Sequence, residues 1–252
     1  MERTVVKGVV LRSVDTREAD KILTVLTAER GKIPVVAKGA RSRRSKVTAA
    51  TQLLAYAELV LSESHGWQYL TEANTLELFD GVRQDVERLS LASYFAELVE
   101  SVTYEEAEAG EILSLLLNAL YALGTLKKEP ELVKAAFEMK LMSLIGFEPL
   151  LEGCVYCGEE HPAEPVLDLQ GGVLRCTGCG AGSGRSARIT PGALAAMRHV
   201  IYGEARRLYS FRLEPEDLRR FSQAAESYVS ALTERSFRTL DFYKSMRRFA
   251  PQ

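Results

Sequence analysis

The sequence predicts an α+β protein in which an N-terminal barrel of five strands precedes a helical bundle that carries a four-cysteine module. Three observations support this. Residues 1–80 contain five segments rich in strand-forming residues, the apolar period lengthens to that of a helix after Phe79, and all four cysteines fall into two closely spaced pairs. We therefore expect one domain over residues 1–80 and a second over 81–252, with the cysteine module inserted at about 152–185.

The first 80 residues alternate between strand-forming segments and turns marked by Gly31, Gly39 and Gly66. The predicted strands, rich in Val, Ile, Leu, Thr and Tyr, are Thr4–Arg12, Lys21–Thr27, Lys32–Ala37, Leu53–Leu61 and Gln68–Phe79. Five short strands fit a small closed barrel, and the OB-fold has that number of strands. Periodicity alone does not separate it from another five-stranded barrel.

Beyond Phe79, apolar residues recur at helical spacing over 89–102 and over 112–123. Pro130 suits the first turn of a third helix, and Gly146 suits the turn that ends it. Thr190 and Pro191 form an N-cap and first-turn pair for a further helix, and Pro215 opens the last long one. The second domain is therefore predicted to be a helical bundle.

The composition is that of a globular protein, with 46% hydrophobic and 26% charged residues. The longest apolar stretch, Ile112–Leu126, is shorter than the roughly 20 residues that a membrane span needs. The N-terminus has no apolar run behind a basic start, as a signal peptide would. We expect a cytoplasmic protein with no membrane partner.

Charge is unevenly distributed along the chain. The formal net charge is only −2, but residues 1–61 hold twelve Lys and Arg against six Asp and Glu. The rest of the chain is correspondingly acidic. A polyanion is therefore expected to bind at the N-terminal domain.

The four cysteines occur as Cys154-x-x-Cys157 and Cys176-x-x-Cys179, with eighteen residues between the pairs. A two-residue gap lets both thiolates of a pair reach one tetrahedral ion, and Gly158 and Gly180 suit the tight turns that follow. Four protein ligands leave no open position for water, so the pattern predicts one structural Zn²⁺. Two disulfides or four packed thiols are the alternatives, and a cytoplasmic protein disfavours disulfides.

No catalytic residue is predicted. A zinc deaminase needs a His-x-Glu motif, but His161 is followed by Pro162 and Ala163. His65, His161 and His199 are isolated and are interpreted as surface or structural residues. A phosphate-binding loop, a nucleophile elbow and a recognisable carboxylate pair are all missing from the sequence.

A basic segment lies between the third and fourth predicted strands. It contains no acidic residue and five cations, Lys38, Arg41, Arg43, Arg44 and Lys46. Such a loop attracts phosphates, while Gly39, Ser42 and Ser45 would keep it flexible. A solvated charge run is the alternative. Tyr56, Trp67 and Tyr69 are candidates for stacking on bases, although core packing is the preferred role of each single aromatic.

Two further groups of cations leave alternatives open. Near the C-terminus, basic and aromatic residues interleave, either to contact nucleic acid or to dock on the bundle; they are Arg235, Phe237, Arg238, Phe242, Tyr243, Lys244, Arg247, Arg248 and Phe249. Lys134 and Lys140 are candidates to bind an acidic, hydrophobic peptide tail at a helical groove, with core packing and solvated lysines as the alternative.

The N-terminal motifs and the order of elements resemble the RecO family of recombination mediators. The motifs are Lys7–Arg12, Glu18–Leu23, Gly31-Lys32 and above all Val36–Arg41, and the order is barrel, helices, four-cysteine module and helices. The resemblance covers nearly the whole chain. Some RecO proteins lack the cysteines, so the resemblance alone does not imply zinc. The zinc prediction depends on the four cysteines of this sequence.

The resemblance implies an OB-fold that binds single-stranded and double-stranded DNA, and strand annealing or loading without ATP. RecR and single-stranded DNA-binding protein are the implied partners in recombinational repair, at the nucleoid in the cytoplasm. Lys38 and Arg41 match the family's DNA-contacting motif, whereas Arg43, Arg44 and Lys46 are assigned because they share the loop. A zinc-containing transcriptional or scaffolding adaptor and a metalloenzyme remain as alternatives.

Overall fold

The computed structural model describes residues 3–180 and 184–249. The chain forms two compact units, one of residues 1–126 and 237–252 and the other of residues 127–236. The first unit holds the barrel with four helices, and the second holds three helices and the cysteine module. This division follows spatial contacts, and the predicted domain boundary near residue 80 stays a prediction.

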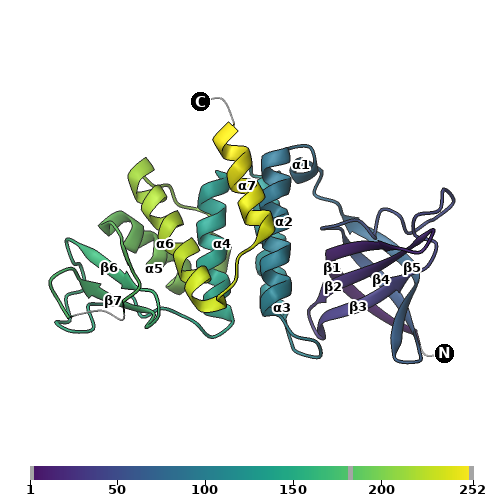
Figure 1. The fold of residues 1–252 in the computed structure, drawn as a ribbon, viewed down its shortest axis with the longest axis horizontal. Coiled ribbons are helices and arrows are strands. Elements are labelled where there is room, and N and C mark those ends of the chain that lie inside the picture. The colour runs from purple at the N-terminus through teal and green to yellow at the C-terminus, as the bar shows by residue number, and fades with distance from the viewer. Residues whose placement is uncertain (1–2, 181–183, 250–252) are drawn as a thin grey trace. The chain divides into compact units, whose positions relative to one another are not determined.

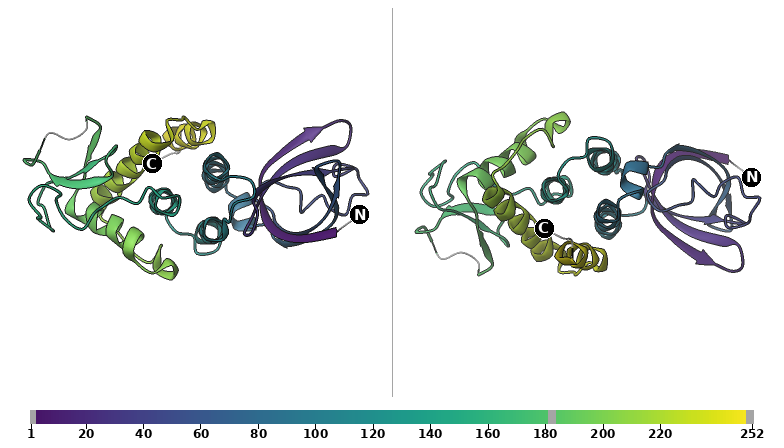
Figure 2. Two further views of the ribbon diagram at one scale, coloured as in Figure 1. Left: turned by 90° about the horizontal axis from the view of Figure 1, so that it is seen from below. Right: turned by 90° about the horizontal axis from the view of Figure 1, so that it is seen from above.

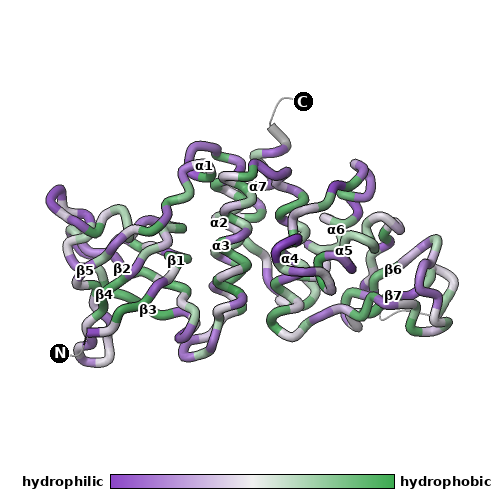
Figure 3. The backbone as a smooth tube through the Cα atoms, turned by 180° about the vertical axis from the view of Figure 1, so that it is seen from behind, coloured by the Kyte–Doolittle hydropathy of each residue, from purple (hydrophilic) through white to green (hydrophobic). Residues whose placement is uncertain are grey.

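The barrel confirms the predicted five-stranded OB-fold. Its strands are β1 (Arg3–Thr16), β2 (Asp20–Thr27), β3 (Gly31–Ala37), β4 (Tyr56–Ser64) and β5 (Trp67–Glu77). They follow the order β1-β2-β3-β5-β4 and close into the ring that Figure 2 shows end-on, because β1 pairs with β4 and β3 pairs in parallel with β5. Leu23, Val25, Ile33, Val35 and Leu59 alternate with outward-facing residues and fill the interior. Figure 3 shows the apolar residues that the barrel strands carry.

Four helices complete the first unit: α1 (Asp80–Arg83), α2 (Val86–Val102), α3 (Gly110–Gly124) and α7 (Arg238–Phe249). The segment between α2 and α3 is fixed to the turn between β2 and β3, where the Lys32 N–H donates to the Tyr104 carbonyl at 3.2 Å. Gly31 permits this approach, since its φ is 60° and an added Cβ would lie 2.1 Å from the Tyr104 oxygen. The helices are therefore attached to the barrel through backbone contacts.

The second unit contains α4 (Pro130–Leu144), α5 (Pro191–Tyr202), a 3₁₀ helix η1 (Ala205–Arg207) and α6 (Pro215–Thr233). The predicted helix starts are confirmed, and the Thr190 side chain accepts a hydrogen bond from the Ala193 N–H at 3.1 Å. Between α4 and α5 lies a sheet of the order β7-β6-β8, which was not predicted. Its strands are β6 (Pro165–Asp168), β7 (Val173–Cys176) and β8 (Ser186–Arg188), of which β6 and β7 are labelled in Figure 1.

Across residues 3–180 and 184–249, the helices are too short or too polar to span a bilayer.

Candidate nucleic-acid interface and metal centre

The basic loop, defined here as residues 38–55 between β3 and β4, closes one end of the barrel. Ala40, Ala50 and Ala55 belong to the barrel core, and Val47 packs against it. The five predicted cations are all exposed. The small apolar residues of the loop therefore fill the barrel end while its cations face solvent.

The shape of the basic loop is fixed by hydrogen bonds to the hairpin between β1 and β2. The Gly39 N–H donates to the Asp20 carboxylate at 2.8 Å, and the Arg41 N–H donates to the Ala19 carbonyl at 2.9 Å. Within the loop, the Thr48 hydroxyl donates to the Ala40 carbonyl at 2.9 Å. Gly39 adopts a φ of 63°, which permits the turn directly after β3. Gly39, Ser42 and Ser45 were expected to make the segment flexible. In the structure the segment instead forms turns that are held by hydrogen bonds.

The five cations of the loop differ in their availability to a ligand. Arg41 forms an ion pair with Asp15 at 3.2 Å, and the Lys38 ammonium lies 4.6 Å from the centre of the Tyr69 ring. Within the described part of the chain, the side chains of Arg43, Arg44 and Lys46 have no ion pair or hydrogen bond. These three charges are the most accessible to a polyanion, since no protein carboxylate neutralises them.

Of the three candidate aromatics, Tyr69 lies beside Lys38, and Tyr56 directly follows the basic loop at the start of β4. Trp67 pairs with Ser64 and Tyr69 with Ser62, whereas Tyr56 pairs with Glu77 at the opposite end of the β4–β5 ladder. Trp67 is 49% exposed. The structure therefore groups Tyr69 with Lys38. Trp67 lies two residues before Tyr69 on the same face of β5, and Tyr56 lies at the other end of the β4–β5 ladder.

Sequence reasoning missed a second anchor of the loop, which is Arg83 on α1. Its guanidinium donates to the Leu53 carbonyl and, at 3.1 Å, to the Gln52 side chain. Burial lowers the pKa of Arg83 below its ordinary value, although Asp80 opposes this. This contact could not be predicted from the sequence, because α1 and the loop are distant along the chain.

The C-terminal segment docks within the first unit through two of its aromatics. Phe237 and Tyr243 are buried, and the Phe237 ring meets Tyr94 of α2 edge-on at 5.6 Å. Arg247 forms an ion pair with Glu87 of α2 at 3.4 Å. Docking therefore explains Phe237 and Tyr243, whereas Phe242 is exposed and a nucleic-acid contact of the cations stays a prediction. The side chains of Arg248 and Phe249, which belonged to the predicted cluster, lie outside the described residues.

The expectation that Lys134 offers its charge to a peptide is wrong. Its side chain is only 3% exposed and its ammonium lies 3.0 Å from carboxylate oxygens of both Glu138 and Glu226. The Lys140 ammonium donates to the Ile201 carbonyl at 3.0 Å, so it too is held inside the second unit. Burying a lysine requires such partners, and here both lysines stabilise helix packing.

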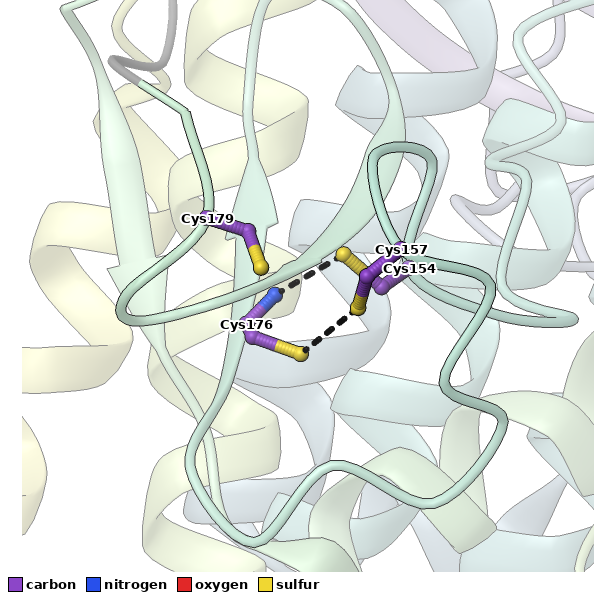
Figure 4. A group of neighbouring side chains, drawn as sticks. All are labelled: Cys154, Cys157, Cys176 and Cys179. Carbon is purple, nitrogen blue, oxygen red and sulfur yellow. Dashed lines mark hydrogen bonds between the residues drawn. The ribbon is translucent and has the colours of Figure 1, made fainter.

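The four predicted cysteines come together at the end of β7 and the start of the module (Figure 4). All four sulfurs lie within 4.8 Å of one another, and the Cys157 and Cys176 sulfurs are 3.7 Å apart. A tetrahedron of sulfurs about 2.3 Å from Zn²⁺ has edges of about 3.8 Å. Gly158 and Gly180 have φ values of 76° and 65°, which confirms the tight turns expected after each pair. The donor set therefore fits one closed metal site.

The charge state of the thiols also fits a cation. Burial raises the pKa of Cys154, but backbone N–H groups of Cys157, Cys176 and Tyr156 donate to its sulfur and lower the pKa to about 6. Burial and the neighbouring sulfurs raise the pKa of Cys176 to about 12, and the Cys157 sulfur raises that of Cys179. Four thiolates this close repel one another, so full ionisation requires a positive ion among them.

Arg198 of α5 supports the first cysteine pair and was missed by sequence reasoning. Its guanidinium donates to the Leu151 carbonyl at 2.8 Å, to the Glu152 carbonyl at 2.9 Å and also to the Glu160 carbonyl. These carbonyls flank Cys154 and Cys157 on both sides. One side chain therefore holds the segment before the pair and the segment after it on the same helix.

Comparison with known proteins identifies the relatives of this chain. A family model described as "Recombination protein O N terminal" matches residues 1–79, and one described as "Recombination protein O C terminal" matches residues 83–241. A "DNA repair protein RecO" of Symbiobacterium thermophilum is 36% identical over 96% of this chain and 97% of its own length. Another of that name, from Acetivibrio thermocellus, is 32% identical over 96% of each chain.

Proposed function

The chain belongs to the RecO family of DNA repair proteins, and from this we propose that it is a non-enzymatic protein of recombinational repair that binds single-stranded and double-stranded DNA. It anneals complementary strands without ATP and acts with RecR as a recombination mediator. The observation that carries this proposal is the basic loop. An ordered turn at the end of an OB-fold barrel presents Lys38, Arg41, Arg43, Arg44 and Lys46 to solvent.

Annealing needs no fuel if the protein reduces repulsion between strands. Two single strands repel through their phosphates, and a protein that neutralises phosphates on one strand lowers the barrier to pairing. Arg43, Arg44 and Lys46 form no ion pair with other described residues, so their charges are available to phosphates. The loop therefore matches the electrostatic requirement for annealing.

The proposed setting is the nucleoid in the cytoplasm, where the partners are RecR, DNA and DNA coated with single-stranded DNA-binding protein. We further propose that Cys154, Cys157, Cys176 and Cys179 hold one structural Zn²⁺. The ion would balance the thiolate charge and hold the module between α4 and α5 in shape. It takes no part in DNA chemistry in this proposal.

The annealing proposal is tested with complementary strands coated with single-stranded DNA-binding protein. We expect the purified chain to accelerate duplex formation in the absence of ATP, as measured by loss of signal from a dye that reports unpaired strands. A chain that binds DNA but leaves the pairing rate unchanged would contradict the annealing activity. RecR is then added to ask whether it modulates the rate.

The loop assignment is tested with the triple variant Arg41→Ala, Arg43→Ala, Arg44→Ala. If each arginine neutralises one phosphate, the slope of log affinity against log salt should fall by roughly two for single strands. The loss should be similar for unrelated sequences, because phosphate contacts do not read bases. The matched control replaces Arg188, Arg206 and Arg212 of the second unit, which are also exposed. Equal slopes for wild type and loop variant would exclude the loop.

A further inference from the structure

The outer face of the barrel carries an apolar row that crosses four strands beside the basic loop. Val14 pairs with Ile22, Ile22 pairs with Val36, and Val36 pairs with Tyr69. Directly paired residues of neighbouring strands point to the same face of a sheet. The barrel core takes the alternate residues Leu23, Val35 and Ala37, so this row faces outward.

The row is accessible to a ligand. Val14 and Ile22 are 42% and 37% exposed, and Trp67, two residues before Tyr69 and hence on the same face, is 49% exposed. Val36 and Tyr69 are half-buried. Elsewhere on the outer face the apolar residues Val9 and Leu26 have no exposed surface. One part of the outer apolar face is therefore buried and the other part is exposed to solvent. Binding of a ligand would explain why apolar residues are exposed there.

Positive charge borders the row where β3 ends. Lys38 follows β3 directly, and its ammonium lies 4.6 Å from the centre of the Tyr69 ring. The Asp20 carboxylate accepts the Gly39 N–H at 2.8 Å, which fixes the start of the basic loop two residues from Ile22 along β2. The ligand that matches this border is anionic on one side and flat and apolar on the other, as a nucleotide is.

We propose that Val14, Ile22, Val36, Tyr69 and Trp67 form a platform that takes the unpaired bases of a single strand whose phosphates lie along the basic loop. The inference rests on the proposed DNA-binding function. It adds that the platform binds unpaired bases. Bases in a duplex are stacked on one another and do not reach it. The barrel therefore holds single strands through a contact that salt does not weaken, in addition to the phosphate contacts that salt does weaken.

The test uses the full chain, whose only tryptophan is Trp67. Two probes of equal length are titrated, oligothymidylate and an abasic deoxyribose-phosphate strand. We expect oligothymidylate to quench the Trp67 fluorescence, and the abasic strand to bind more weakly without quenching it. Salt should reduce the affinity of both probes with the same slope, because the phosphate contacts are the same.

The variants separate the platform from the loop. Tyr69→Ala should weaken binding of oligothymidylate by roughly tenfold and leave binding of the abasic strand unchanged, whereas Tyr69→Phe should keep wild-type affinity. Tyr121→Ala, an exposed tyrosine of α3, is the matched control. Equal affinity for the two probes with Trp67 unquenched would overturn the platform while DNA binding stands. Failure of both probes to bind would overturn the proposed function together with the platform.

Discussion

At the residue scale, the partner of each cation decides whether a ligand can reach its charge. Lys134 and Arg43 carry the same formal charge, but Lys134 is held between two carboxylates and Arg43 is exposed on the basic loop. Sequence placed Arg43 correctly on a loop between strands. It could not show the burial of Lys134, because Glu226 lies on another helix and only folding brings the two together.

Asp15 should weaken DNA binding because it competes with phosphate for Arg41. The two groups form an ion pair at 3.2 Å, with both side chains partly exposed. Asp15→Asn releases the guanidinium, so we expect higher affinity for single strands and a salt slope that is steeper by about 0.7 if one more phosphate is contacted. Glu72→Gln removes an equal charge from β5 and serves as the control in the same titrations. An unchanged slope would show that Arg41 does not contact phosphate.

Lys134→Met should destabilise the second unit by about 3 kcal/mol, because it leaves the fully buried Glu138 without the lysine charge. The double variant Lys134→Met, Glu138→Leu should recover most of that loss. Both are measured by denaturant unfolding, and a single variant as stable as wild type would contradict a stabilising role for the ion pair.

The same contact has a defined pH dependence. Burial lowers the pKa of Lys134, but the charges of Glu138 and Glu226 outweigh it and raise the pKa above its ordinary value of 10.5. A raised folded pKa means that the stabilisation is fully present below the unfolded pKa and is lost as pH rises through the folded one. Wild type should therefore lose its advantage over Lys134→Met only in strongly alkaline solution.

At the element scale, local chemistry was sufficient for most helices and strands. Pro130, Thr190 and Pro215 begin helices as predicted, because capping and first-turn preferences act within a few residues. The sheet of β6, β7 and β8 was not predictable in this way. Its strands are three or four residues long, too short to show an alternating pattern, and β6 is buried throughout.

The cysteine module should depend on its metal for its shape. Cys157→Ser removes one of four ligands, so we expect the metal content of purified protein to fall well below one zinc per chain. Amide exchange should become faster at Val155, whose N–H donates to the Leu174 carbonyl, and at Leu174, whose N–H donates to the Leu150 carbonyl. Glu160→Ser, an exposed change in the same segment, is the control. Removal of the metal by a chelator should reproduce the effect of Cys157→Ser. A metal-free wild type with unchanged exchange and melting would contradict the structural role.

At the scale of the whole molecule, proximity along the chain does not decide which unit a helix joins. The C-terminal helix α7 belongs to the same compact unit as the barrel, although the residues of the second unit precede it. Sequence predicted that aromatics of this segment could dock on helices. It could not identify α2 as the surface, because an amphipathic pattern shows that one helix face is buried and does not show against what.

The docking of α7 should therefore stabilise the first unit and leave the second unaffected. Phe237 is 5% exposed and packs edge-on against Tyr94, so Phe237→Ala should cost about 3–5 kcal/mol. Trp67, the only tryptophan, reports on the first unit, and zinc content reports on the second. We expect the Trp67 unfolding transition to move to lower denaturant while the zinc content stays that of wild type. Phe242 lies on α7, which Phe237 directly precedes, and is 53% exposed, so Phe242→Ala should leave both signals unchanged. Loss of zinc in Phe237→Ala would show that the two units unfold together.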